Sequence, residues 1–385
     1  MTSLHMRRAA TIAFATALWT GSAGAASVRH CFGREATSFD GQYIDVNVSN
    51  VAVEWWYAQA VAVPVGDNPA ANVEVLFYQG YPILEGSRDP SDPEYYVTIN
   101  GIFANGTAFN FNLPASTGAV TSCDDAVHGS WGEVGSFHVD EDLSSFTATI
   151  SAPAFGVSGT IQLQSNAVHH FACNSTVDAY FDSAMSSDLQ LNTAEEILFE
   201  QLGWATTIPG GTAHVNLSID GTAFDIIGNG YHDANWSPVP LNEVVSSWYF
   251  LQAQVGPFDM SGILAVPLNS TRNLSTGYLS ESGVILQNQC SLAGSRTTDF
   301  SNITTYGSYH DSTSNVTLPT GFILSYITAN GDEYAFNLTS LGQNPDETIY
   351  HRWIGTASGG EVGGAQYTGT TVFEWLNPGL NIYDA

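Results

Sequence analysis

Apolar and polar residues alternate along much of this chain, a pattern typical of strands that bury one face. Residues 147–150 (Thr-Ala-Thr-Ile) and 159–164 (Gly-Thr-Ile-Gln-Leu-Gln) are clear examples. Asn-Gly and Asp-Gly pairs, which provide the positive φ angles of tight turns, separate such runs. The pattern therefore predicts antiparallel β-structure throughout, with turns at the pairs that begin at Asn100, Asn105, Asp220 and Asn330.

Residues 193–202 are the one good candidate for a helix. Thr193 is placed to cap its start, Glu196 follows three residues later, and Gly203 is placed to end it. We expect one or two short helices at most.

Internal similarity suggests that the chain contains two related halves. Residues 53–61 (VEWWYAQAV) resemble residues 247–255 (SWYFLQAQV), and residues 105–109 (NGTAF) recur at 220–224 (DGTAF) and more loosely at 330–336. We interpret these echoes as two related β-barrels or sandwiches. The alternative is that similar hairpin turns recur for purely local reasons. We place the two β-domains at 26–195 and 196–385.

The first 25 residues have the features of a secretory signal peptide. Arg7 and Arg8 precede an apolar run at 9–19, and the small residues at 23–25 form a cleavage site. We therefore expect the mature protein to begin close to Ala26 and to enter the secretory pathway or the extracellular space. No later apolar run is long enough to span a bilayer, so we expect no stable membrane insertion after cleavage.

Glycosylation sequons and cysteines fit the same route. The four cysteines are widely spaced and even in number, which predicts two disulfides with three possible pairings, and buried free thiols are the alternative. These are Cys31, Cys123, Cys173 and Cys290. We expect glycans on several of the sequons at Asn47, Asn105, Asn174, Asn216, Asn269, Asn273, Asn302, Asn315 and Asn337. A tenth sequon, at Asn235, is expected to stay unmodified because it lies in a candidate pocket.

The composition excludes several mechanisms. All 8 basic residues are arginines, so Schiff-base chemistry, pyridoxal phosphate attachment and a Walker-loop lysine are absent. The formal net charge of -29 disfavours nucleic acid and anionic membranes as partners. With 44% hydrophobic residues, the chain is nevertheless globular.

Familiar cofactor and metal motifs are also missing from the sequence. It contains no G-x-S-x-G, H-E-x-x-H, G-x-G-x-x-G or Walker pattern. His169 and His170 are adjacent, and adjacent residues of a strand point to opposite faces, so they make a poor metal site. We expect neither a cofactor nor a catalytic metal.

The densest polar and aromatic cluster lies at residues 228–238. It brings His232, Asp233 and Asn235 together with the rings of Tyr231 and Trp236. A carboxyl group among such rings loses hydration, which raises its pKa and lets it act as a Brønsted acid near neutral pH. The alternative is a structural strand end whose aspartate caps a turn.

A second candidate is the aromatic segment near the start of the chain. In a strand, Glu54 and Trp56 share one face, and Trp55 and Tyr57 share the other. Trp56 is then placed to line a cavity beside Glu54, although core packing explains such a segment equally simply. Glu374 near the C-terminus either closes a cavity or lies at a strand edge.

The order and spacing of these motifs resemble the hydroxyneurosporene-synthase/AttH-like superfamily over about residues 45–380. The similarity is greatest to its fungal branch of decalin-forming Diels-Alderases and epoxide-rearranging cyclases. The resemblance is carried by 54–57 (EWWY), 208–211 (IPGG), 230–238 (GYHDANWSP), 248–250 (WYF) and 254–258 (QVGPF).

This resemblance implies two lipocalin-like antiparallel β-barrel domains, a substrate pocket at or near their junction, and no cofactor. In relatives the aspartate that matches Asp233 is a proposed acid. Ala234 stands where many relatives carry a basic or imidazole side chain, and Ser237 where bacterial members usually have glycine, which disfavours hydratase chemistry.

We therefore predict a cofactor-independent cyclase or isomerase of secondary metabolism that closes or rearranges a ring in a hydrophobic small molecule. Asp233 is the predicted acid, His232 and Glu54 orient the acid or the substrate, and the substrate-binding residues are Trp56, Tyr231, Asn235, Trp236 and Trp248. A non-catalytic lipocalin-like binder of an apolar ligand, or a hydratase of the hydroxyneurosporene synthase type, is the alternative. A secreted glycan-binding β-sandwich is a third interpretation.

Overall fold

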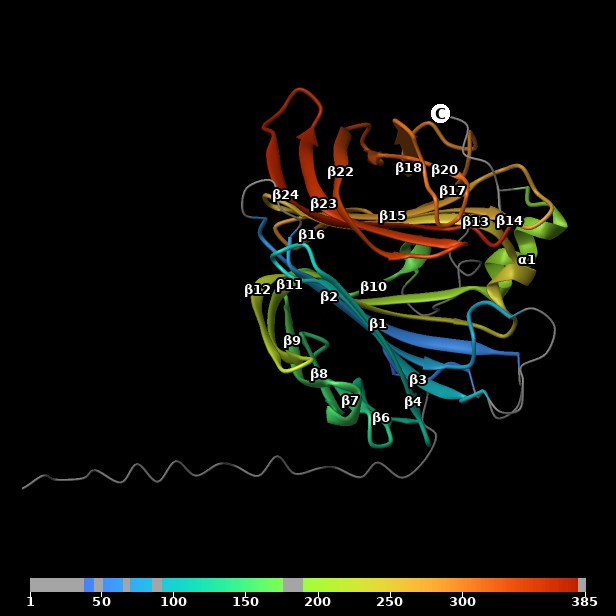
Figure 1. Cartoon of the computed structure of the whole chain (residues 1–385). Coiled ribbons are helices and arrows are strands. Elements are labelled where there is room, and N and C mark those ends of the chain that lie inside the picture. Colours follow the sequence, from blue (N-terminus) through green and yellow to red (C-terminus); the bar gives the residue numbers. More distant parts are fainter. Residues whose placement is uncertain (1–37, 45–50, 65–69, 85–91, 176–189, 380–385) are drawn as a thin grey trace, which may run out of the picture. The chain divides into compact units, whose positions relative to one another are not determined.

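The computed structural model describes residues 38–44, 51–64, 70–84, 92–175 and 190–379. Strands dominate these residues and form two large antiparallel sheets, which we call the first and second sheets (Figure 1). The predicted all-β class with two barrel-like sheets is confirmed. The predicted signal peptide, Cys31 and the sequon at Asn47 lie outside the described residues.

The first sheet has the strand order β4-β3-β2-β1-β12-β11-β9-β8-β7-β6-β5, and β10 pairs with β11. Its strands are β1 (Val53–Ala62), β2 (Asn72–Gln79), β3 (Tyr95–Ile102), β4 (Ala108–Ala115), β5 (Ala119–Cys123), β6 (Ala126–Trp131), β7 (Gly135–Val139), β8 (Ser145–Ala152), β9 (Val157–Ser165), β10 (His170–Phe171), β11 (Gly203–Ile219) and β12 (Thr222–Ser237).

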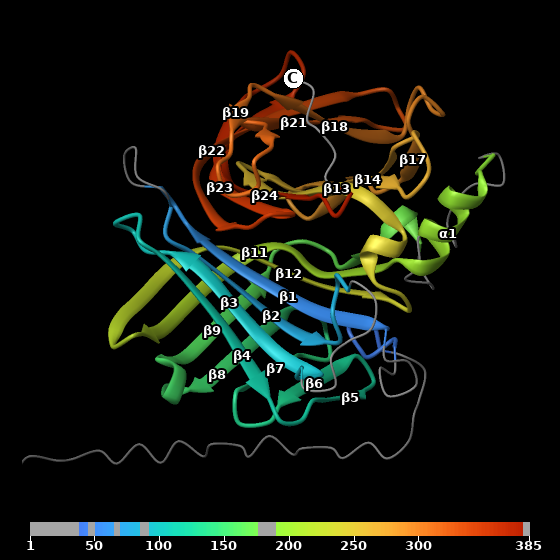
Figure 2. The same ribbon diagram turned by 45° about the vertical axis from the view of Figure 1, so that its right-hand side comes forward.

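The second sheet has the order β16-β15-β14-β13-β24-β23-β22-β21-β18, and β17 pairs with β15. Figure 2 shows that this sheet curls into a nearly closed ring. Its strands are β13 (Val245–Val255), β14 (Phe258–Pro267), β15 (Leu274–Glu281), β16 (Val284–Gln287), β17 (Cys290–Leu292), β18 (Phe300–Tyr306), β21 (Gly321–Ile327), β22 (Glu333–Asp346), β23 (Tyr350–Glu361) and β24 (Tyr367–Leu376). Among the described strands, the short strands β19 (Tyr309–His310) and β20 (Thr317–Leu318) pair only with each other.

The similar segments 53–61 and 247–255 occupy equivalent places in the two sheets. They form β1 and β13, the strands with which the two sheets begin along the chain. Each pairs on one side with the following strand, β2 or β14, and on the other side with the strand of its sheet that comes last in the chain, β12 or β24. The turn echo has a different origin. The turns at 105–109 and 220–224 both belong to the first sheet, so their similarity reflects hairpin chemistry.

The change of sheet falls between Ser237 and Val245, and the predicted domain boundary at residues 195 and 196 does not coincide with it. The reason is strand pairing. β12 pairs along its length with β1, and β11 pairs with β9, so both long strands complete the first sheet.

Helix α1 (Thr193–Gln201) confirms the predicted helix, but its cap lies one residue earlier than predicted. Asn192 is the N-cap, and its side chain and that of Glu195 exchange hydrogen bonds with each other's backbone N–H groups. Glu195 also pairs with the guanidinium of Arg272. The described residues also contain three short 3-10 turns, η1 (Pro153–Phe155), η2 (Ala172–Asn174) and η3 (Leu241–Glu243).

A disulfide joins Cys173 to Cys290 and thereby links the segment after β10 to β17 of the second sheet. Cys123 is disulfide-bonded as well, so the described cysteines are oxidised as predicted. Of the predicted glycosylation sites, Asn273 and Asn302 are half-buried. The exposed ones are Asn105, Asn174, Asn216, Asn269, Asn315 and Asn337.

Strands β1 and β13 are buried on both faces, unlike an outer strand such as β4, whose residues alternate between buried and exposed. One face of β1 packs on the core of the first sheet, and the other meets side chains of the second sheet. This position explains the near-continuous apolar run of 53–61. No helix among the described residues is long and apolar enough to cross a membrane.

Candidate active site

A cavity of about 320 Å³ lies where the two sheets face each other. The side chains that line the cavity come from every second position of the surrounding strands, because residues i and i+2 of a strand point to the same face. Examples are Trp248 and Phe250 on β13. The other lining residues are Trp55, Tyr57, Leu76, Tyr78, Tyr81, Pro82, Ile83, Tyr96, Thr98, Asn100, Asp233, Asn235, Leu241, Ile263, Pro345, Glu347, Ile349, Tyr350, Arg352, Glu374 and Leu376.

Aromatic rings form much of the cavity wall on both sides. From the first sheet, the rings of Tyr78 and Tyr96 stack at 4.6 Å between centroids. The ring of Tyr57 meets that of Phe250 from the second sheet edge to face at 6.3 Å. Such walls bind a largely apolar ligand and present negative ring faces to any positive charge that develops on it.

Asp233 is a buried carboxyl group on this wall, 3% exposed. Its Oδ2 atom accepts hydrogen bonds from the Tyr231 hydroxyl at 2.5 Å and from the Trp204 indole N–H at 2.7 Å. Its Oδ1 atom has no hydrogen-bond partner among the described residues. Burial raises the pKa of Asp233 to about 7, although the two donors on Oδ2 act in the opposite direction.

A buried cation balances the acidic side chains on the facing wall. The guanidinium of Arg352 donates from Nε to Oε1 of Glu374 at 2.8 Å and lies 3.0 Å from Oε2 of Glu74. Its Cζ atom lies 5.3 Å from the ring centroids of both Tyr57 and Tyr350. Burial raises the pKa of Glu74 to about 7, and Arg352 opposes this rise.

Two further predicted residues, Trp248 and Asn235, line the cavity. Within the part of the chain that the structure describes, the indole N–H of Trp248 is buried without a hydrogen-bond partner, so it is a donor that a ligand can use. Asn235 donates to the carbonyl of Ala234 at 2.9 Å. With Asp233 and its partner Tyr231, four of the eight predicted site residues belong to this region.

His232 lies on the opposite face of β12, away from the cavity. Its Nδ1 atom lies 2.7 Å from the carbonyl oxygen of Tyr57, and its Nε2 atom 3.0 Å from Oδ2 of Asp40. Burial alone would lower the pKa of His232, but the Asp40 carboxylate raises it above the ordinary value. The structure therefore gives His232 a role in holding Asp40 inside the first sheet.

Glu54, Trp56 and Trp236 also face away from the cavity. Glu54 accepts backbone N–H groups of Tyr43 and Ile44, and the Trp56 indole donates to the carbonyl of Asp40 at 3.0 Å. Trp236 stacks on Tyr43 at 3.8 Å. The prediction that Trp56 lines the cavity beside Glu54 is wrong, because the Trp55 and Tyr57 face of β1 meets the second sheet.

Sequence reasoning missed Arg352 and Tyr57 as cavity residues. Arg352 lies in the apolar strand segment Tyr-His-Arg-Trp-Ile at 350–354, and an arginine in such a segment is a usable signal of a buried ion pair. Strand alternation would predict Tyr57 as a cavity residue if the sequence revealed which face of β1 meets the second sheet.

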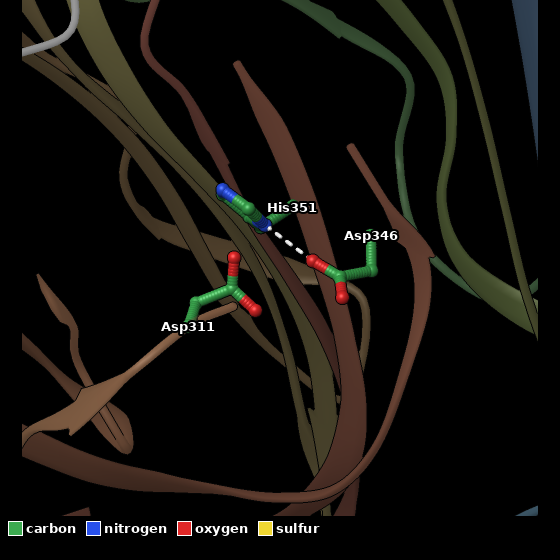
Figure 3. A group of neighbouring side chains, drawn as sticks. All are labelled: Asp311, Asp346 and His351. Carbon is green, nitrogen blue, oxygen red and sulfur yellow. Dashed lines mark hydrogen bonds and ion pairs between the residues drawn. The ribbon is translucent and has the colours of Figure 1, made fainter. Parts of the chain in front are cut away.

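One group of described residues has the composition of a metal site, but it lies outside the cavity lining. Asp311, Asp346 and His351 present ligand atoms within 4.8 Å of one another (Figure 3). The carboxylate of Asp346 already accepts from His351 Nδ1 at 3.0 Å and from Gln343 at 3.0 Å, and Asp311 accepts from Ser314. Hydrogen bonds between protein side chains therefore explain why these three residues lie close together.

Comparisons with known proteins agree with this architecture. The sequence model of the Diels-Alderase-like family matches residues 52–377. The quinolone epoxide rearrangement protein asqO of Emericella nidulans is 27% identical over 333 residues, which cover 86% of this chain and 84% of that protein. The quinolone epoxide rearrangement protein penF of Penicillium thymicola is 27% identical over 320 residues, 82% of each chain. The crystal structure of CghA superimposes with a TM-score of 0.65 at 20% identity, covering 85% of this chain and 88% of that one.

Proposed function

Because this chain belongs to the Diels-Alderase-like family, we propose that it is a cofactor-independent cyclase or isomerase of secondary metabolism. It acts on a hydrophobic small molecule that binds in the cavity between the two sheets. Asp233 is the general acid, and the reaction is an acid-assisted ring closure or rearrangement.

The geometry of Asp233 is the observation that carries this proposal. Two donors occupy Oδ2, so the acidic proton of the neutral carboxyl group resides on Oδ1. Oδ1 has no partner in the described protein, and the residue lines the cavity. A bound substrate oxygen is thus the acceptor that this proton lacks.

The acid step is balanced by simple chemistry within the substrate. As the C–O bond of an epoxide breaks, the Asp233 proton moves to the departing oxygen and positive charge develops on the carbon. A nucleophilic group of the same substrate then attacks this carbon and forms the new bond. That group gives its proton to the Asp233 carboxylate, which restores the acid. The rings of Tyr57 and Tyr350 beside Arg352 shape the conformer that closes, and hydrogen bonds to Oδ2 stabilise the carboxylate that is left.

Turnover of a quinolone epoxide is the first test, because both curated relatives are named for that rearrangement. The purified protein should increase the rate of conversion and fix the stereochemistry of the product. If tryptophan fluorescence reports saturable binding while rate and product ratio match the uncatalysed reaction, the protein is a binder and the proposal fails.

A further inference from the structure

A second cleft opens at the other end of the strands that line the cavity. It has a volume of about 860 Å³. Along β13, Phe250 lines the cavity and Gln254 lines the cleft, with Gln252 between them. The side chain of Gln59 donates to Gln252 at 2.8 Å, and neither residue belongs to the lining of the cavity or of the cleft.

Asp259 is the unusual residue of this cleft. Asp259 is only 6% exposed, yet its carboxyl group has no hydrogen-bond or ion-pair partner among the described residues. A Cβ atom at position 210 would lie 2.0 Å from its Oδ1, so Gly210 leaves the space that the carboxyl group occupies. Burial raises the pKa of Asp259 to about 6, since no group among the described residues stabilises its charged form.

The other polar groups of the cleft are neutral. Asn229 donates to Thr370 at 2.8 Å, and Gln254 donates to the carbonyls of Gly211 and Gly230, so both carboxamide oxygens remain as acceptors. The lining contains hydroxyl groups but no arginine, histidine or aromatic ring. An anionic or flat aromatic ligand therefore finds no partner here.

A polyhydroxylated ligand matches this set of groups. Each hydroxyl both donates and accepts, so it can use carboxamides, threonine hydroxyls and a carboxylate together, whereas an ammonium group only donates. Two neighbouring hydroxyls can also donate in parallel to the two oxygens of one carboxylate.

From this geometry we propose that the cleft is a second binding site, distinct from the cavity, for a neutral polyhydroxylated ligand such as a sugar unit. Asp259 is its principal acceptor, and the threonines and carboxamides of β12, β13 and β24 surround it.

Saturation-transfer NMR with maltose and cellobiose tests the site. The wild-type protein should transfer saturation to at least one of these sugars. Asp259→Asn should weaken the affinity about tenfold or more, because a hydrogen bond to a charged group is lost. Thr368→Trp should block the cleft without unfolding the protein, since Thr368 is exposed at its margin.

Asp225→Asn and Thr121→Trp are matched controls, because both residues are exposed and lie outside the cleft lining. They should bind sugar like the wild type. Absence of transfer to either sugar overturns the proposal, as does equal transfer in Thr368→Trp and wild type. Displacement of the sugar by propylammonium at lower concentration would show that the ligand is a cation and would also overturn it.

Discussion

Asp233 shows how neighbouring residues of one strand acquire different chemistry. Its neighbour His232 points into the first sheet and pairs with Asp40, whereas Asp233 faces the cavity. Tyr231, on the same face as Asp233, supplies one of its two hydrogen bonds. Because successive residues of a strand point to opposite faces, one face of β12 carries a structural ion pair and the other carries the candidate acid.

Asp233→Asn should lower the rate constant of the chemical step by about 10²- to 10⁴-fold, the usual contribution of a general acid. The carboxamide keeps the shape of the side chain but has no acidic proton. Single-turnover kinetics with a quinolone epoxide measure the loss, and Asp225→Asn on the same strand is the exposed control. A loss of only a few-fold would indicate that shape alone accelerates a pericyclic reaction.

The rate should fall as pH rises through about 7, because the acid must be protonated and burial raises the pKa of Asp233 to that value. Tyr231→Phe removes a donor that stabilises the carboxylate, so it should move this fall to higher pH. A pH–rate profile of both proteins measures the shift. If the profile of Tyr231→Phe were unchanged, the group that titrates would not be Asp233.

At the scale of the elements, β1 and β13 have the most constrained surroundings. Each lies beside the last strand of its own sheet and is buried on both faces. Their similar sequences follow from this shared position, since each must supply one face to its own sheet and the other to the contact between sheets.

The Cys173–Cys290 disulfide stabilises the short segment around β10 and β17. Replacing both cysteines with serine should lower the free energy of unfolding by about 2 to 5 kcal/mol, because the unfolded chain is no longer held in a long closed loop and regains conformational entropy. Denaturant titration of the variant and the wild type measures this change. Equal stability would show that packing alone holds the segment.

At the scale of the whole molecule, the secretory route remains a prediction from the signal-peptide pattern, the sequons and the cysteines of the sequence. Mature protein should begin close to Ala26 and carry glycans at exposed sites such as Asn105 and Asn337. Asn235 should carry none, because it lines the cavity. N-terminal sequencing and glycopeptide mass spectrometry check these expectations, and an intact Met1 on secreted protein would contradict the first.

Local sequence determined most strands, the position of the helix and the hairpin turns at Asn105, Asp220 and Asn330, because alternation, Asn-Gly and Asp-Gly pairs and capping residues act over a few residues. The turn predicted at Asn100 is wrong, because Asn100 and Gly101 lie within β3 and pair with β2 and β4. Local sequence also identified Asp233 and Trp248 as cavity residues. The helix cap was displaced by one residue, since both Asn192 and Thr193 are able to cap and each has a glutamate three residues later; in the structure Asn192 forms the capping box with Glu195.

Long-range packing decided what local sequence left open. A period of two states which residues share a face, but it does not state which face meets the second sheet. The Trp55 side chain packs in a cluster with Trp248 of β13, whereas the Trp56 side chain packs against Trp131 of the first sheet. The change of sheet after β12 depends on its pairing with β1, and the Cys173–Cys290 pairing depends on how the two sheets approach. The Arg352 cluster likewise exists only where β2, β23 and β24 meet, because no local pattern links Glu74 with Glu374.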